Sequence, residues 1–123
     1  MSHPWKSKVY WALSGVGWGV RSQSNFIVHL TAAAAVVIAA TLLRASLLEW
    51  CGLGLCIAIV LAAELFNTAL EHLARAVTRE HNEEIRHALD TSAGAVLVAA
   101  TGAVLVGGAI LINRLGLWLE WWR

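Results

Sequence analysis

Residues 51–71 read CGLGLCIAIVLAAELFNTALE, an apolar run of membrane-spanning length that carries three strongly polar side chains. Glu64, Asn67 and Glu71 are spaced so that, on a helix, all three lie on one face. Moving a carboxylate into hydrocarbon costs on the order of several kcal/mol. Two carboxylates and an amide on one face therefore indicate a partner: a cation, a proton or a phosphate-bearing ligand. The alternative is a polar seam that only joins helices.

The composition is that of a membrane protein. Of the 123 residues, 59% are hydrophobic and only 14% are charged, and the mean hydropathy is +0.66. A chain of this length is too short for several domains and too apolar for a soluble one, so we predict a single membrane domain over residues 1–123. The net charge of +1 comes without a basic stripe, which argues against a nucleic-acid partner.

The hydropathy pattern predicts an all-α integral-membrane fold. Three apolar stretches, at about 26–48, 50–71 and 91–112, each have roughly the twenty residues that a bilayer core requires. Before them, residues 5–25 have the mostly helical apolar spacing of an amphipathic surface helix. The seven tryptophans fall outside the span interiors, as in the aromatic belts of membrane proteins: Trp5, Trp11, Trp18, Trp50, Trp118, Trp121 and Trp122.

The distribution of basic residues predicts the orientation of the chain. Cytoplasmic loops carry an excess of lysine and arginine. The N-terminal segment and the second loop hold Lys6, Lys8, Arg21, Arg75, Arg79 and Arg86, whereas the first loop and the C-terminal segment hold Arg44, Arg114 and Arg123. We therefore expect the N-terminus and residues 72–90 in the cytoplasm, which places Glu64 to Glu71 near the cytoplasmic leaflet.

The second loop is the most polar part of the chain. We expect the second span to continue as helix to about Glu80, and Asn82, followed by two glutamates, to cap the next helix. Asp90 would then lie two turns into that helix, near the membrane surface and facing Glu71. Most of the other charges in this loop are expected to belong to a solvated connector.

These residues resemble a known family. Glu64-Leu-Phe-Asn-Thr-Ala-Leu-Glu71, the later Ala88-Leu-Asp90 with the Ser-Ala-Gly-Ala-Val that follows it, and Ser24-Asn-Phe-Ile-Val-His-Leu30 are similar to segments of the small prokaryotic diacylglycerol kinases and undecaprenol kinases. The resemblance extends from about residue 10 to 112. It implies a homotrimer in the bacterial inner membrane, with active sites shared between neighbouring subunits. It also implies transfer of the ATP γ-phosphate to a lipid hydroxyl at the bilayer surface.

The resemblance implies a role for individual residues. Glu64 would be the general base for the lipid hydroxyl, Asn67 would orient the substrate or the γ-phosphate, and Glu71 would bind the Mg²⁺ that bridges the ATP phosphates. Such oxygen ligands suit a hard cation, and phosphoryl transfer depends mainly on positioning and charge neutralisation. The residues expected at the nucleotide are Trp11, over the adenine, and Glu80, His81, Asn82, Leu89 and Asp90.

Three positions depart from the family pattern. Gln23 stands where the family has a second metal-binding glutamate, and Leu89 stands where it has a lysine that contacts phosphate. Arg75 replaces an aspartate and could supply the positive charge that Leu89 lacks. Losing a cation from the transition state weakens phosphoryl transfer. The losses at Gln23 and Leu89 are opposite in sign.

Three functions are therefore open on the sequence. The first is a lipid kinase with a remodelled nucleotide site. The second is a repurposed family scaffold that binds lipid and metal without phosphotransfer from ATP. The third is a small ion or proton pathway built on the glutamates. The acceptor, diacylglycerol or undecaprenol, is not decided by the sequence, although residues 24–30 look more like the undecaprenol kinase branch.

Overall fold

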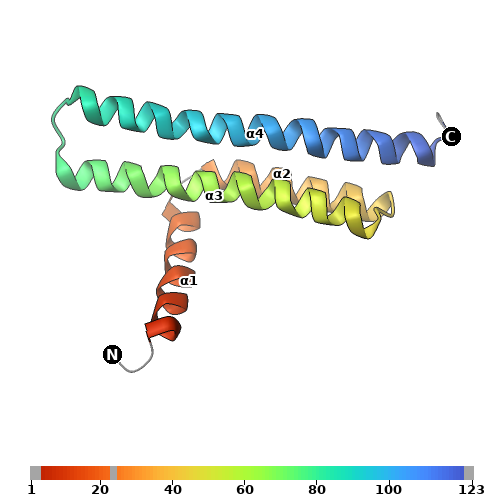
Figure 1. Ribbon diagram of the computed structural model, residues 1–123, viewed down its shortest axis with the longest axis horizontal. Helices are drawn as coiled ribbons and strands as arrows, with labels where there is room; N and C mark the ends of the chain where they lie inside the picture. The colour runs from red at the N-terminus through yellow and green to blue at the C-terminus, as the bar shows by residue number, and fades with distance from the viewer. Residues whose placement is uncertain (1–3, 23–24, 121–123) are drawn as a thin grey trace.

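The computed structural model describes residues 4–22 and 25–120, and over these residues the chain is helical with short connections (Figure 1). The predicted all-α class is confirmed. The described part of the chain forms four helices: α1 (Pro4–Ser22), α2 (Asn25–Leu42), α3 (Leu47–Val77) and α4 (Glu83–Trp118).

Three of these helices, α2, α3 and α4, are long and apolar enough to cross a membrane. With a rise of 1.5 Å per residue, the 31 residues of α3 extend for about 46 Å and the 36 residues of α4 for about 54 Å. Both lengths exceed the bilayer core of about 30 Å. One or both ends of α3 and α4 therefore project beyond the hydrocarbon, where charged side chains can be solvated.

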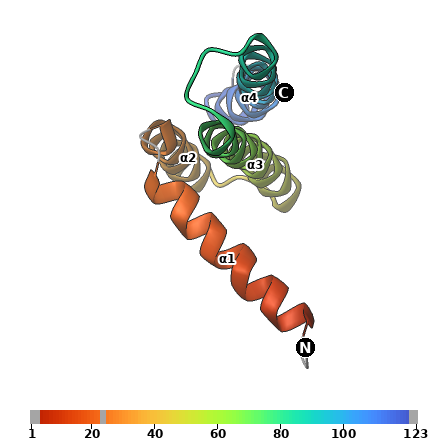
Figure 2. The same ribbon diagram turned by 90° about the vertical axis from the view of Figure 1, so that its left-hand side faces the viewer.

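The three long helices lie side by side with α3 in the middle, while α1 runs steeply across them (Figures 1 and 2). A helix in this orientation can lie along the membrane surface while the others span it. The C-terminal end of α1 contacts α3, and Gly19 is buried there. A Cβ at Gly19 would come within 2.8 Å of Leu65 Cδ2, so a residue without a side chain permits this close approach. Beside it, the Trp18 ring packs edge-on against His72 at 4.4 Å.

The helix ends differ from those predicted in two places. α2 ends at Leu42 rather than near residue 48, because the chain turns there: Arg44 has a φ of 56°, and Ser46 begins the next helix. Ser46 Oγ accepts from the Glu49 backbone N–H, while the Glu49 carboxylate accepts from the Ser46 N–H. This reciprocal capping box fixes the start of α3.

At the other end of the hairpin, α3 stops at Val77 and does not reach Glu80, because Thr78 is extended. α4 begins at Glu83, so the predicted span 91–112 is the interior of a longer helix. Asn82 caps α4 as predicted: its side chain accepts from the Ile85 N–H at 3.0 Å. The polar segment 72–90 is therefore mostly helix, joined by the short connector 78–82.

The end of the bundle away from this connector is fastened by Arg114 on α4. Its Nε lies 3.4 Å from Glu49 Oε1, and its Nη2 donates to the Arg44 carbonyl. One side chain thus joins α4 to the turn between α2 and α3.

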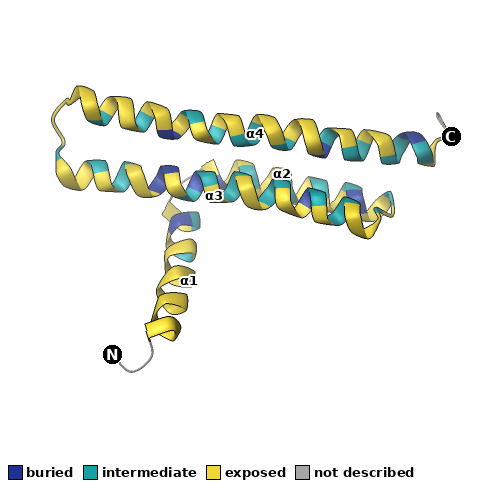
Figure 3. Ribbon diagram, viewed as in Figure 1, coloured by how far each residue is buried: buried dark blue, intermediate teal, exposed yellow. Residues whose placement is uncertain are grey.

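Most large apolar side chains on the described helices are exposed (Figure 3). In the most apolar window of α4, only 6% of the residues are buried. Outer faces this apolar require lipid or further protein around them. A homotrimer would supply further protein around these helices, and it stays a prediction.

Replacing Ser46 with Ala should lower the unfolding free energy by about 1 kcal/mol, because one capping bond of α3 is lost. Denaturant titration in mixed micelles, followed by tryptophan fluorescence, would measure the change. Thr41→Val is the matched control, since the Thr41 hydroxyl donates only to Val37 O within its own helix. Equal unfolding free energies for Ser46→Ala and the wild type would contradict the role of the cap.

Candidate functional site

Glu64, in the middle of α3, is buried and pairs with α2. Glu64 is 2% exposed, and its Oε2 lies 3.3 Å from His29 Nε2. Its other oxygen, Oε1, is also buried and has no hydrogen-bond partner among the described residues. A carboxylate oxygen in this position is costly to leave without a partner, so it is a candidate acceptor for a ligand.

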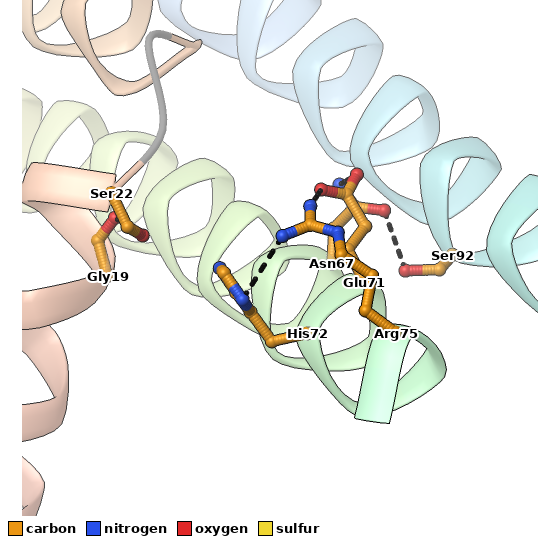
Figure 4. Close-up of polar contacts among 7 residues, drawn as sticks. All are labelled: Gly19, Ser22, Asn67, Glu71, His72, Arg75 and Ser92. Carbon is orange, nitrogen blue, oxygen red and sulfur yellow. Dashed lines mark hydrogen bonds and ion pairs between the residues drawn. The ribbon is translucent and has the colours of Figure 1, made fainter. Parts of the chain in front are cut away.

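One turn further along α3, Asn67 links two helices (Figure 4). Its Nδ2 donates to Glu71 Oε1 at 2.9 Å, and its Oδ1 accepts from Ser92 Oγ on α4 at 2.8 Å. Asn67 and Ser92 are both buried, whereas Glu71 is partly exposed. The amide therefore has a fixed orientation, and it holds the Glu71 carboxylate at the edge of the α3–α4 interface.

Arg75 adjoins this cluster from the next turn of α3. Its Nη2 lies 3.8 Å from Glu71 Oε2, and its Nη1 lies 3.3 Å from His72 Nδ1 (Figure 4). His72 in turn packs against Trp18, so a continuous series of contacts runs from Glu71 to α1. The guanidinium is about half exposed and can turn toward a ligand.

A polar hollow of about 520 Å³ opens between the end of α3, the connector and the start of α4. It brings together Glu71 and three arginines, Arg75, Arg79 and Arg86. Guanidinium groups match phosphate oxygens with paired donors, so this hollow suits a polyphosphate. Four residues predicted at the nucleotide also line it: Glu80, His81, Asn82 and Leu89.

A second, apolar groove of about 340 Å³ runs between α2, α3 and α4. His29, Leu61 and Ala100 line one end of it, and Val36, Leu53 and Leu111 line the other, because α3 runs opposite to α2 and α4. The His29 end is the end nearest Glu64. The groove therefore offers an apolar channel with a polar end.

The predicted site residues fall into separate groups. Asn67 and Glu71 are in contact, Glu64 lies one turn away with His29, and the connector residues surround the hollow. Asp90 is exposed and is not among the residues that line the hollow. Trp11 is exposed on α1, where its ring contacts Tyr10. Gln23, the expected second metal ligand, lies outside the described residues.

The sequence left four residues of the site unassigned. His29 and Ser92 had a weak signal, as polar side chains in predicted apolar or small-residue segments, but their partners are on other helices. Arg79 and Arg86 were assigned only to the solvated loop. Arg79 follows Arg75 by one turn, and this spacing could have indicated a basic face.

Within the described ranges 4–22 and 25–120, no group of three or more histidines, cysteines or acids is arranged to hold a metal ion. Glu71 is a single carboxylate beside an arginine-lined hollow. Mg²⁺ is often held by one or two carboxylates together with substrate phosphates. Glu71, beside the arginine-lined hollow, could hold such an ion together with a phosphate ligand.

The fold and the buried polar cluster define a small α-helical integral-membrane protein with a polar site at one end of its helices. The chain belongs to the prokaryotic diacylglycerol kinase family, whose model matches residues 10–111. The family resemblance stated from the sequence is thereby confirmed.

Two relatives show how far the similarity extends. The chain is 39% identical over 106 residues to a diacylglycerol kinase of Synechocystis sp., and 36% identical over 101 residues to the undecaprenol kinase of Bacillus subtilis. These matches cover 85% and 82% of this chain, and 61% and 82% of the respective relatives. The chain thus spans less than two thirds of the Synechocystis protein. No solved structure matches the chain.

Replacing Ser92 with Ala should destabilise the protein by about 1–3 kcal/mol, because Asn67 Oδ1 would be left buried without a donor. The unfolding free energy in mixed micelles measures this effect. Thr101→Ala is the control on the same helix, since that exposed hydroxyl donates only to Leu97 O. A loss no greater than that of the control would mean that the Ser92–Asn67 bond adds little to stability.

Proposed function

We propose that this protein is a membrane lipid kinase that transfers the γ-phosphate of ATP, with Mg²⁺, to the hydroxyl of diacylglycerol or undecaprenol. The family and the names of the two relatives support a lipid phosphotransferase. The observation that carries the proposal is a juxtaposition on α3. A buried carboxylate, paired with a histidine that lines an apolar groove, lies next to a polar cluster that opens into an arginine-lined hollow.

In this proposal Glu64 is the general base. A base must lie within hydrogen-bond reach of the proton that it removes. The apolar groove can hold the hydrocarbon of the acceptor, and its His29 end brings a terminal hydroxyl toward Glu64. Asn67, held between Glu71 and Ser92, would orient the acceptor or the γ-phosphate.

The nucleotide would bind in the polar hollow. Arg75, Arg79 and Arg86 can contact its phosphates, and Glu80, His81 and Asn82 border the same space. We assign Arg75 the positive charge that Leu89 cannot supply. Asp90 and Trp11 remain proposed nucleotide contacts, although neither lines the hollow of a single chain. A neighbouring subunit of the proposed homotrimer could bring them to a shared site.

Magnesium would be held by Glu71 and the nucleotide phosphates, with Gln23 as a further proposed ligand. The bound ion would neutralise phosphate charge during transfer. Glu71 must give up its 3.8 Å contact with Arg75 to bind a cation fully. That contact is long enough to exchange easily, and Asn67 would keep the carboxylate in place.

The orientation completes the proposal. The protein would span the bacterial inner membrane. Its N-terminus and the connector 78–82 would face the cytoplasm, where ATP is available. The three arginines of the hollow lie at this end of the helices, in agreement with the excess of basic residues in cytoplasmic segments.

Two observations favour a second candidate function. Arg75 is close to the carboxylate that should bind the metal, and Leu89 removes a cation from the phosphate site. Both features fit a repurposed family scaffold that binds lipid and metal without phosphotransfer from ATP. Phosphorylation of a lipid alcohol by Mg·ATP separates the two candidates.

The first test is transfer of labelled γ-phosphate from Mg·ATP to lipid by the purified protein in mixed micelles. Diacylglycerol and undecaprenol are offered in parallel, and Glu64→Gln is the comparison variant. We expect a labelled lipid product with the wild type and a rate lower by about 10²–10⁴-fold with the variant, because the base is lost. No product with either lipid, from folded protein, would favour the second candidate.

Glu71→Gln tests the metal assignment. We expect lipid phosphorylation to fall to background at ordinary Mg²⁺ concentrations, because a neutral amide is a poorer ligand for a hard cation. Activity is measured across a Mg²⁺ titration, with Glu120→Gln, at the opposite end of α4, as the control acid. An unchanged Mg²⁺ dependence in Glu71→Gln would refute the role of Glu71.

A further inference from the structure

We infer that His29 is a positioning residue for Glu64: it binds one carboxylate oxygen and leaves the other directed to the acceptor hydroxyl. This inference deepens the proposed function and rests on it. His29 is not part of the Glu64–Glu71 sequence motif, because it lies on another helix, near the start of α2.

The contact joins a partly exposed histidine to a buried carboxylate. His29 Nε2 lies 3.3 Å from Glu64 Oε2, and the side chains are 19% and 3% exposed. Because one oxygen is held from α2, the carboxylate cannot rotate freely about its last bond. Its orientation is therefore fixed relative to both helices.

The second oxygen of the same carboxylate has no such partner among residues 4–22 and 25–120. Glu64 Oε1 is buried and lacks a hydrogen-bond donor within the described part of the chain. A buried acceptor without a donor is unusual in proteins and calls for an explanation. A base needs an oxygen that no other donor occupies, since the proton of the substrate must arrive there.

The groove shows from which side the hydroxyl would approach. His29 lines the apolar groove at the end that adjoins Glu64, while the remaining lining residues there are apolar. A lipid chain in the groove would carry its polar end past the His29 ring. The ring therefore borders the proposed substrate path and contacts Glu64, which does not itself line the groove.

The proposed phosphoryl transfer needs no reactant besides the lipid alcohol and ATP. The acceptor O–H proton passes to Glu64 Oε1, and the acceptor oxygen forms a bond to the γ-phosphorus. The bond between that phosphorus and the bridging oxygen breaks, and ADP leaves with the electron pair. His29 takes no part in the proton transfer, and its Nε2 stays beside Oε2.

The alternative is that His29 only fastens α2 to α3. A fastening contact would affect stability, and any residue that restores packing would restore the protein. A positioning contact requires a donor at the same place. It would change the rate of the chemical step more than the binding of either substrate.

The experiment compares His29→Leu with His29→Gln in the lipid phosphorylation assay. We expect His29→Leu to lower kcat by about 10- to 100-fold with unchanged KM for ATP and lipid, because the base is misplaced. We expect His29→Gln, whose amide can still donate to Oε2, to stay within about 3-fold of the wild type. Thr31→Val, on the same helix with a hydroxyl that bonds only to Ile27 O, is the control.

Several outcomes would overturn the inference. A wild-type kcat in His29→Leu would do so, and so would equal losses in both His29 variants that follow their melting temperatures. If the wild type phosphorylates no lipid, the proposed function itself fails and takes the positioning role with it. A defect confined to His29→Leu leaves the proposed function intact and supports the role.

A second measurement covers the case in which His29→Leu does not fold. The ¹⁵N side-chain NMR signals of His29 are recorded in the wild type and in Glu64→Gln, and are assigned by their loss in His29→Gln. We expect the Nε2 signal to shift when the carboxylate becomes an amide. An unshifted signal would show that the pair does not form and would overturn the inference.

Discussion

The structure depends on how acidic side chains are accommodated in an apolar helix. A buried polar group is tolerated when partners compensate for the lost water, and α3 finds partners on both sides, although Glu64 Oε1 is left without one among the described residues. His29 of α2 pairs with Glu64, and Ser92 of α4 fixes Asn67, which in turn holds Glu71. The central position of α3 follows from this, since its polar residues need partners on both neighbours. The same pairs determine which groups remain open to a ligand.

The helices and the family could be predicted from the sequence, because apolar length and the Glu64–Glu71 motif are local signals. Helix ends were harder to predict, because the early end of α2 depends on the left-handed backbone of Arg44 and the capping box at Ser46. The partners His29 and Ser92 could not be predicted from spacing, since they come from different helices. Asp90 is exposed, and the prediction that it faces Glu71 stays a prediction.

The site also separates two kinds of environment along one helix. Toward its middle, α3 borders an apolar groove, and toward its end it borders a hollow with three arginines. Asn67 and Glu71 lie where one gives way to the other. A reaction between a water-soluble nucleotide and a membrane lipid needs such a boundary, since neither reactant can move far into the solvent of the other. The length of α3, which exceeds the bilayer core, allows one helix to contribute to both environments.

The short connector between α3 and α4 has a consequence for how the chain enters the membrane. Asn67 and Ser92 are only 25 residues apart, on facing arms of one hairpin. Their hydrogen bond can therefore form as soon as the two arms meet. The amide and the hydroxyl would then be transferred into lipid as a mutually satisfied pair. Glu64, in contrast, is paired with His29 of the preceding helix α2, so this contact can form before α4 is synthesised.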